Sequence, residues 1–420
     1  MRTVHLLRKY NPAEWGGTET AIHRLFDGLR KQNVSSIVYC PQTKGSVSVK
    51  DPLQAAGCQI ERFKAFVPIW GISEQEKRQL ISVGGNLMSF DLIPSLWRQK
   101  DISIVHTHTL GRIGSIGMTF AKRRKLPLVV TIHGGVLDLP EKVKNSFHHP
   151  VRKGVEWGRL FGLLLRTHQL LDDADAIITC NTREAELWQQ KFPSKHVMVQ
   201  PHGVPMEVYQ KDQRSVARTA FPQLENKKIL LSLGRIDFIK NQAWLIEQAP
   251  AIFRKHPDTM LVLAGACTEE KYGKMIEKRI QELGLEDRVF LTGGLPPGDP
   301  RLIGLLQSAE VLILPSLSET FGLVLLEAWA AGTSVISSRT SGASALIKHG
   351  ENGWLFDLEN AQSFQDSVNQ TLSNPGMRAQ LAAAGGRLVA SEYNTDVLAG
   401  RMKNLYQKLI EEKNALRHNS

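Results

Sequence analysis

Cysteine is scarce in this chain, with only four among 420 residues. Cys40, Cys58, Cys180 and Cys267 form no C-x-x-C pair and show no zinc-ligand spacing, which excludes the zinc-finger class. We therefore expect small buried apolar side chains in a reducing compartment, with neither a disulfide nor a structural metal.

Long apolar runs are also missing. No run approaches the ~20 apolar residues that span a bilayer, and the charges of the N-terminal MRTVHLLRK interrupt the apolar stretch that a signal peptide needs. The sequence therefore predicts a cytoplasmic protein. Its 42% apolar and 22% charged content is typical of an ordered globular protein, and its length indicates about two domains.

Acidic residues are few in the first half only. Residues 1–200 contain 28 Lys and Arg against 17 Asp and Glu, a net charge of +11, whereas the remainder contains 24 of each. A basic half indicates an anionic partner, namely a phosphorylated acceptor, a membrane surface or nucleic acid. A solvated basic face without a partner explains the charge equally well. No RNA-binding signature is present, so we expect no nucleic acid.

Short apolar, β-branched runs alternate with helix-length segments, which predicts an α/β fold with parallel sheets covered on both faces. The polar stretch 201–226 separates two series, so we expect domains at 1–205 and 206–394, and a helical segment at 395–420 that packs back towards the first domain. The expected strands are Thr3–Leu7, Ser36–Cys40, Ile102–His106, Leu128–Ile132, Ala176–Thr179, Val197–Gln200, Lys228–Leu233, Met260–Ala264, Arg288–Thr292, Glu310–Pro315 and Ser334–Ser337.

The segment 314–336 carries the most chemistry. It reads as strand, loop, helix and strand, with Glu319 in the loop and Glu327 inside the helix. The helix start offers free N–H groups to an anion such as a diphosphate, and Gly322 permits close approach of the backbone. Glu327 could accept hydrogen bonds from ribose hydroxyls and Glu319 from those of a sugar. The alternative is a capping acid in the loop and a solvent-facing glutamate.

This segment resembles the paired-glutamate signature of the retaining glycosyltransferases of family 4. The resemblance implies a GT-B fold, in which two facing Rossmann-like, doubly wound domains enclose a cleft. The N-terminal domain would bind the acceptor and the C-terminal domain the nucleotide-sugar donor. The resemblance implies that Thr320, Phe321 and Leu323 bind the donor together with Gly322 and Glu327. It also places Glu319 at the reacting sugar.

Two further elements are similar to the same family. Gly234-Arg235…Lys240 resembles its Gly-Arg…Lys element and supplies two cations for the diphosphate, although Asn241 stands where glycine is frequent. The Gly16-Gly17 turn would approach the donor or the acceptor.

The resemblance also places His133 beside the transferred sugar. His106 and His108 could line the same site, but we favour satisfied polar groups at a strand end for both.

Two other motifs are weaker. Asp173-Ala-Asp175 matches a metal-binding D-x-D, but it precedes a strand and reads as exposed acids. Leu263-Ala-Gly-Ala-Cys267 lacks the G-x-G-x-x-G pattern of a dinucleotide site. We therefore expect no metal and no cofactor beyond the donor itself.

The resemblance implies transfer of a hexose-type sugar from a UDP- or GDP-linked donor to the hydroxyl of a sugar, glycolipid or small molecule, in cell-surface polysaccharide or glycolipid synthesis. Retention follows from same-face attack, which we favour, or from a covalent intermediate. The alternatives are a nucleotide-sugar epimerase, a phosphorylase or an inactive binding scaffold.

Membrane contact stays open. The basic cluster Lys122–Lys125 and the amphipathic segment Arg152–Leu171 could lie on an anionic leaflet. An apolar stripe of this kind is more often part of the domain core, which we favour. Peripheral attachment to the inner face of the cell membrane is the second hypothesis.

Overall fold

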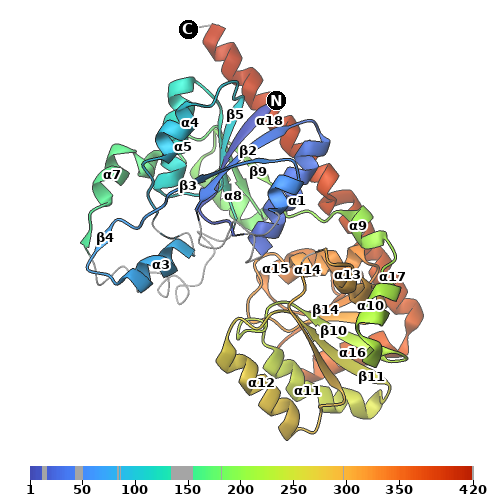
Figure 1. The fold of residues 1–420 in the computed structure, drawn as a ribbon. Helices are drawn as coiled ribbons and strands as arrows, with labels where there is room; N and C mark the ends of the chain where they lie inside the picture. Colours follow the sequence, from blue (N-terminus) through green and yellow to red (C-terminus); the bar gives the residue numbers. More distant parts are fainter. Residues whose placement is uncertain are drawn as a thin grey trace. The chain divides into compact units, whose positions relative to one another are not determined.

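The computed structural model describes residues 1–11, 17–42, 51–82, 85, 87–133, 155–180, 182–296 and 298–418. The chain divides into two compact units, of which the first comprises residues 1–203 with 396–420 and the second residues 204–395. Figure 1 shows helices on both sides of each sheet. Within the described residues, no helix is both long and apolar enough to cross a membrane.

The first unit is built on a seven-stranded parallel sheet of order β3-β2-β1-β5-β6-β8-β9. Its strands are β1 (Arg2–Leu6), β2 (Ser35–Pro41), β3 (Gln59–Phe63), β5 (Ile104–Thr107), β6 (Leu128–Ile132), β8 (Ala176–Thr179) and β9 (His196–Val199). A separate antiparallel pair joins β4 (Ile69–Trp70) to β7 (Val155–Glu156). The chain reverses its direction of travel across the sheet between β1 and β5, which makes this the topological switch point.

Two apolar cores cover this sheet because successive residues of a strand point to opposite faces. Val4 and Leu6 of β1 belong to one core, whereas Leu7 belongs to the other. The second core also contains Met402 and Tyr406 of the C-terminal helix. The helical segments of this unit are α1 (Gly17–Lys31), α2 (Pro52–Ala55), α3 (Glu74–Ser82), α4 (Leu92–Trp97), α5 (Arg112–Arg124), α7 (Arg159–Leu164), η2 (Thr167–Gln169), α8 (Thr182–Lys191) and α18 (Thr395–His418).

The second unit has a six-stranded parallel sheet of order β12-β11-β10-β13-β14-β15. Its strands are β10 (Lys228–Leu233), β11 (Thr259–Ala264), β12 (Val289–Gly293), β13 (Ala309–Leu314), β14 (Ser334–Ser338) and β15 (Trp354–Phe356). In chain order within the unit this is 3-2-1-4-5-6, the order of a Rossmann-like sheet. The expected α/β fold with two such parallel sheets is therefore confirmed.

The helices of the second unit also pack on both faces of their sheet. Leu231 of β10 faces one apolar core and Leu230 faces the other. The helical segments are α9 (Met206–Gln210), α10 (Arg214–Ala220), η3 (Pro222–Leu224), α11 (Gln242–Lys255), α12 (Glu270–Glu282), α13 (Pro300–Ser308), α14 (Leu323–Ala330), α15 (Ser341–Leu346), α16 (Ala361–Ser373), α17 (Pro375–Leu388) and the π-helical turn η4 (Val389–Tyr393).

Candidate functional site

In the second unit, the loops that follow β10 and β11 touch through their backbones. Gly234 and Gly265 have φ values of +150° and +157°. A Cβ atom on Gly265 would lie 1.9 Å from the carbonyl oxygen of Gly234, so only glycine fits there. The N–H of Ile236 donates to the carbonyl of Ala266 at 2.9 Å and holds the two loops together. This contact fixes the backbone that carries Arg235.

Asp237 organises the loop after β10. Its carboxylate is buried and accepts a hydrogen bond from the backbone N–H of Lys240 at 3.0 Å. The same carboxylate pairs with the Arg235 guanidinium at 3.1 Å, while the side chain of Arg235 stays 60% exposed. Arg235 is thus oriented by a buried acid and remains accessible to a ligand.

The loop after β10 is joined to the loop after β13. The N–H of Leu317 donates to the carbonyl of Ile239 at 2.8 Å, and the Asn241 side chain donates to the carbonyl of Pro315 at 3.2 Å. Between these bonds, the Lys240 ammonium pairs with the Glu319 carboxylate at 2.5 Å, and both side chains are largely buried. Two site residues predicted 79 positions apart in sequence are therefore in direct contact.

The start of α14 lies at the same loop. Gly322 precedes the helix with φ +86° and has no side chain of its own to cap the first turn. The other oxygen of Glu319 accepts a hydrogen bond from the N–H of Gly322 at 3.3 Å. A Cβ atom on Gly342 would lie 2.5 Å from the N of Phe321, so the start of α15 also approaches this turn closely. The bond from Gly322 to Glu319 bears out the alternative of a capping acid in the loop. The remaining N–H groups of the first turn and the helix dipole favour an anion here.

Glu327 lies one helical turn after Leu323, on the same side of α14, and is only 5% exposed. The alternative of a solvent-facing glutamate is therefore wrong. Thr320 is exposed and Phe321 is partly buried, with its ring 6.2 Å from that of Tyr393. The helix and loop positions expected for Glu327 and Glu319 are confirmed.

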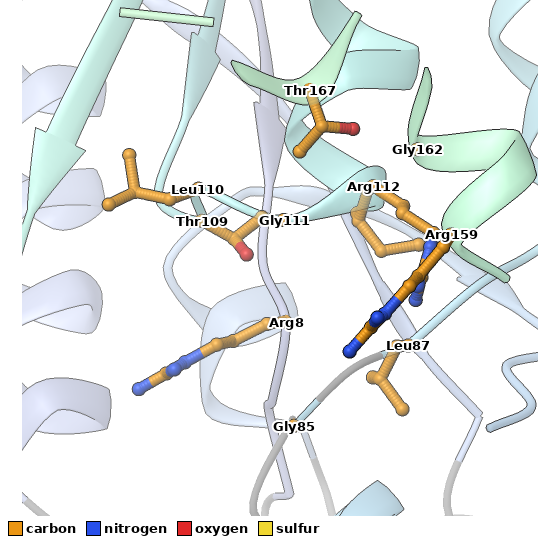
Figure 2. A pocket seen from close by; sticks show the side chains of 11 residues that line it. Arg8, Gly85, Leu87, Thr109, Leu110, Gly111, Arg112, Arg159, Gly162 and Thr167 are labelled. Carbon is orange, nitrogen blue, oxygen red and sulfur yellow. The ribbon is translucent and has the colours of Figure 1, made fainter. Parts of the chain in front are cut away.

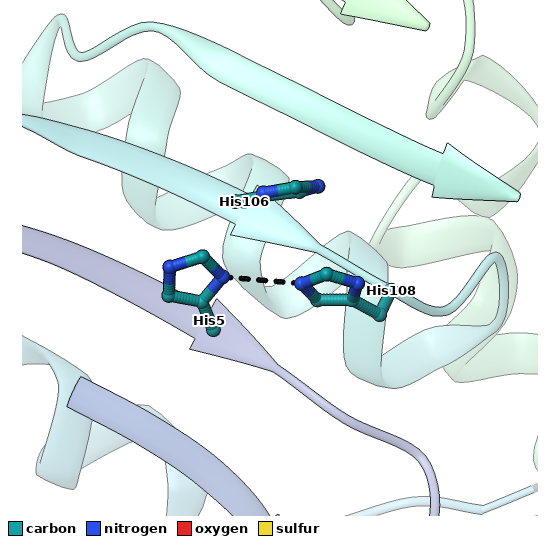
Figure 3. Close-up of side chains that lie close together, drawn as sticks. All are labelled: His5, His106 and His108. Atoms are coloured by element: carbon teal, nitrogen blue, oxygen red, sulfur yellow. Dashed lines mark hydrogen bonds between the residues drawn. The ribbon is translucent and has the colours of Figure 1, made fainter. Parts of the chain in front are cut away.

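In the first unit, the carboxyl ends of the parallel strands carry a group of buried histidines (Figure 3). His133, directly after β6, hydrogen-bonds through Nε2 to Nδ1 of His108 at 2.7 Å. His108 bonds through Nε2 to Nδ1 of His5 on β1 at 3.1 Å, and His5 bonds to the Thr3 hydroxyl at 2.9 Å. We call this row, His133–His108–His5–Thr3, the histidine chain.

Burial keeps the imidazoles of the histidine chain neutral. It lowers the pKa of His5 and of His108 well below the usual value, and that of His133 to about 3. A neutral imidazole carries one N–H, so all three rings must donate in the same direction. The Thr3 hydroxyl lies 3.2 Å from the carbonyl of Ser35, which can only accept.

When Thr3 donates to that carbonyl, every ring donates towards Thr3, and Nδ1 of His133 is left as a bare lone pair. That atom is buried and has no partner among the described residues. The opposite direction would place an unpaired N–H there and would also cost Thr3 its hydrogen bond to the Ser35 carbonyl. The chain therefore presents His133 as a hydrogen-bond acceptor.

His106 belongs to a different hydrogen-bond pair. Its two ring nitrogens contact the hydroxyls of Tyr406 and Thr131, each at 2.6 Å. Both nitrogens of His108 are also bonded within the histidine chain. The preferred interpretation of His106 and His108 as satisfied polar groups is therefore confirmed.

His133, Cys180 and His202 follow β6, β8 and β9, which are neighbours in the sheet. Their possible ligand atoms lie within 4.8 Å of one another. Imidazole nitrogen with cysteine sulfur is a donor set that suits zinc. Burial raises the pKa of Cys180 to about 12. Burial lowers the pKa of His133 and of His202, and the positive charges of Arg8 and Arg24 lower them further. These cations oppose binding of a metal ion. Sequence reasoning missed this cluster because its members come from separate segments.

Several other expectations have plain outcomes. Gly16 lies outside the described residues, and Gly17 is the first residue of α1. All four cysteines are free, but Cys267 is exposed, so its expected burial is wrong. The two acids of the D-x-D motif are both ion-paired: Asp173 pairs with Lys122 and Asp175 with Lys413.

The expected core position of the amphipathic segment is wrong for α7. Leu160, Leu163 and Leu164 are 63%, 66% and 70% exposed. Nearby, Trp70 of β4 and Val155 of β7 are 66% and 67% exposed. Phe161 instead contacts the ring of Trp157, with centroids 5.9 Å apart. The apolar pattern of the segment shows that it is amphipathic but does not tell which of its faces meets a neighbour.

Comparison with known proteins yields two family matches that divide the chain between them. The model described as Glycosyltransferase Family 4 matches residues 15–208, and the model described as Glycosyl transferases group 1 matches residues 214–387.

Among curated proteins, the chain is 25% identical over 430 residues to the D-inositol 3-phosphate glycosyltransferase of Corynebacterium glutamicum (strain R), covering 97% of this chain and 95% of that enzyme. It is 30% identical over 285 residues to the enzyme of the same name from Arthrobacter sp. (strain FB24), covering 67% and 65%. Among solved structures, Anabaena HepE in complex with UDP has the same fold, with a TM-score of 0.72, 17% identity, and coverage of 97% of this chain and 100% of that one.

Proposed function

Because this chain belongs to the group 1 glycosyltransferases of family 4, we propose that it transfers a hexose-type sugar from a nucleoside diphosphate to an acceptor hydroxyl with retention at the anomeric carbon. The observation that carries the proposal is the Lys240–Glu319 contact at the start of α14. The loops around this contact bring together the cations Arg235 and Lys240, the Glu319 carboxylate and free backbone N–H groups. They belong to a unit with the sheet order of a nucleotide-binding fold.

Each residue has a role in binding and activating the donor. Arg235 and Lys240 neutralise the diphosphate, whose negative charge grows as the bond to the sugar breaks. The backbone at Gly234, Thr320, Phe321, Gly322 and Leu323 surrounds the phosphates. Glu319 accepts hydrogen bonds from the sugar hydroxyls, and Glu327 accepts those of the ribose. In the first unit, contact of Gly17 with the donor or acceptor and of His133 with the transferred sugar remain predictions.

We favour attack from the same face that the leaving group departs. The acceptor oxygen forms a bond to the anomeric carbon as the bond to the diphosphate breaks, and the departing phosphate oxygen takes the acceptor proton. Fixed cations then do the work that a metal does elsewhere, so the proposal requires no metal and no cofactor.

UDP is the first nucleotide to test. HepE was solved with UDP, and the two curated relatives described above are each named D-inositol 3-phosphate glycosyltransferase. A thermal-shift panel of UDP, GDP, ADP and their sugar conjugates, without and with magnesium, tests the donor site. We expect one nucleotide family to raise the melting temperature independently of magnesium. No shift with any nucleotide would favour the inactive scaffold.

Product analysis separates the enzyme classes. A glycosyltransferase releases the nucleoside diphosphate in step with acceptor glycosylation, whereas an epimerase converts the sugar nucleotide without releasing it. A phosphorylase would require inorganic phosphate and, as in known phosphorylases, a pyridoxal lysine. The anomeric configuration of the product, read by NMR, tests retention directly.

A second proposal concerns the membrane. The exposed leucines of α7, together with Trp70 and Val155, form an apolar surface in the basic unit of the protein. Such a surface suits the interfacial region of an anionic leaflet, where cations add attraction. We propose peripheral binding at the inner face of the cell membrane and a cytoplasmic location.

Vesicle co-sedimentation tests this proposal. Leu160→Ser/Leu164→Ser should release the protein from anionic vesicles, whereas Leu416→Ser, which changes an equally exposed leucine of α18, should not. Equal binding by both variants would contradict a role for α7.

A further inference from the structure

The histidine chain crosses three neighbouring strands of the first sheet. Thr3 and His5 lie on β1, which pairs with β5, and β5 pairs with β6. His108 directly follows β5, and His133 directly follows β6. Thr3 and His5 are fully buried and His108 is nearly so, which shields their hydrogen bonds from bulk water. The protein itself therefore sets the positions of the protons in the chain.

Packing holds the rings of the chain in place. Phe26 makes an edge contact with the His5 ring, with centroids 4.5 Å apart. The His106 ring lies 5.1 Å from that of His5 and stacks on that of His108 at 4.1 Å, and Figure 3 shows these three imidazoles together. Because neighbouring rings enclose them, the imidazoles keep the same nitrogen towards each partner. What remains open is which nitrogen of each ring carries the proton.

The number of hydrogen bonds decides the direction of the donors. When every ring donates towards Thr3, the chain makes three bonds between its members, and Thr3 donates a fourth to the Ser35 carbonyl. In the opposite direction Thr3 must donate to His5, so the bond to Ser35 is lost and three remain. The Ser36 hydroxyl, 3.2 Å from that of Thr3, can bond to Thr3 in both cases. The first direction is therefore favoured by one hydrogen bond.

A pocket of about 470 Å³ lies at the carboxyl ends of β1 and β5, next to the histidine chain (Figure 2). Thr109, which directly follows His108, lines the pocket, and so does Arg8, two residues after β1. Burial is the main cause of the low pKa of His133, and the nearby charge of Arg8 lowers it further. Open α/β sheets bind ligands at these strand ends. The pocket therefore offers a ligand room near the bare nitrogen of His133.

We propose that three positioning residues, Thr3, His5 and His108, fix the tautomer of the ring that ends the chain. Nδ1 of His133 then accepts a hydrogen bond from a hydroxyl of the transferred sugar. The inference rests on the proposed glycosyltransferase function and deepens it. This nitrogen is buried and has no partner among the described residues, so the ligand hydroxyl supplies the missing bond. A group that offers only lone pairs, such as fluorine, is repelled there, and the chain thus selects a sugar that can donate.

The far end of the chain provides a variant that touches no ligand. Thr3→Val removes the hydroxyl and keeps the shape of the side chain. Both directions then make two hydrogen bonds, those among the three rings, so neither direction is preferred. Thr3→Ser keeps the hydroxyl and with it the preference. Thr371→Val is the matched control, because it removes a fully buried hydroxyl that donates to the Ser367 carbonyl at 2.8 Å, outside the chain.

Nitrogen NMR of the full chain, labelled with ¹⁵N-histidine, measures the tautomer directly, because a protonated and a bare ring nitrogen differ in chemical shift. His133→Gln identifies the signals of that ring. We expect Nδ1 of His133 to carry no proton in the unmodified chain, in Thr3→Ser and in Thr371→Val. In Thr3→Val it should carry a proton in about half of the molecules, because both directions make the same number of bonds. A proton on Nδ1 in the unmodified chain overturns the proposal, even if Thr3→Val fails to fold.

Calorimetric titration tests the effect on the ligand. The probes are UDP-glucose and derivatives in which each hydroxyl of the glucose is replaced in turn by fluorine. We expect one derivative to bind the unmodified chain about tenfold more weakly than UDP-glucose does, the value of one hydrogen bond. Thr3→Val should reduce this ratio to about twofold, because its His133 can also donate. Thr3→Ser and Thr371→Val should keep the ratio. A merely structural defect would weaken all probes alike and leave the ratio unchanged.

The outcomes separate this proposal from the proposed function. A tautomer that Thr3→Val leaves unchanged, or a fluorine ratio that is equal in Thr3→Val and the unmodified chain, overturns the role of the histidine chain. Absence of binding by every sugar nucleotide of the thermal-shift panel would instead contradict the proposed function. The NMR result needs no ligand and would stand in that case.

Discussion

The two sheets share a strand order, but the side chains that contact one another at their carboxyl ends are charged in the second unit and neutral in the first. In the second unit, these ends hold glycines in left-handed or strained backbone and an ion pair between Lys240 and Glu319. In the first unit, they hold neutral histidines bonded to one another. Both ends lie where open α/β sheets bind ligands, and the side chains after each strand give the two positions different chemistry.

The electrostatic difference between the two ends is large. In the second unit, removing a charged side chain should weaken binding of a charged ligand. In the first unit, changing a residue of the histidine chain should alter the direction of its hydrogen bonds and the stability of the fold. The predictions below separate these two kinds of effect.

The largest effect should follow from removing the fixed cation of the second unit. Lys240→Ala should lower kcat/KM for the donor by about 10²–10³, because a fixed cation at a developing charge is worth about 3–4 kcal/mol. Glu327→Gln should also lower kcat/KM, because it removes the carboxylate that we propose accepts the ribose hydroxyls. Both variants should keep a cooperative melt. Glu286→Gln, which changes an exposed acid of the same unit, should leave kcat/KM unchanged. Wild-type turnover by either site variant would show that its role is wrong.

Acid should destabilise the first unit through its histidines. Burial holds the pKa of His133 near about 3 and that of His202 near about 4, below the unfolded value of about 6.5. Their contribution is complete above pH 6.5 and falls as the pH drops towards those values, because the unfolded chain then binds more protons. The loss is about 1.4 kcal/mol per pH unit for each histidine.

Denaturant titrations between pH 8 and pH 5 measure this slope. His202→Gln should reduce it by about one proton. A slope that His202→Gln leaves unchanged would contradict the neutral, buried state of that ring.

A smaller effect should follow from removing the end of the histidine chain. Thr3→Val leaves the His5 ring without its hydroxyl partner and should destabilise the protein by about 1–3 kcal/mol. Thr3→Ser keeps the hydroxyl and should cost less than half as much. Equal destabilisation by both substitutions would indicate lost packing and not a lost hydrogen bond.

The sequence predicted the centre of each sheet because those strands are continuous apolar runs. It did not predict β3 (Gln59–Phe63), whose residues are mixed in polarity, or β15 (Trp354–Phe356), which has only three residues. Both are edge strands, where one side of the ladder has no partner and the apolar pattern is weak.

The donor site and the histidine chain also differ in how far the sequence could predict them. The donor residues lie in two short sequence motifs, and the resemblance of these motifs to a known family was enough to name Lys240 and Glu319. The histidine chain combines residues from distant segments, such as Thr3 with His133. Only the folded sheet brings such residues together, and no local spacing indicates their contact.

The most direct test of the donor assignment is the UDP-induced thermal shift of the unmodified chain measured beside Lys240→Ala, with Lys278→Ala as the exposed control. We predict a shift in the unmodified and control proteins that does not need magnesium and is lost in Lys240→Ala. An equal shift in all three proteins would contradict the placement of the donor diphosphate at the Lys240–Glu319 loops.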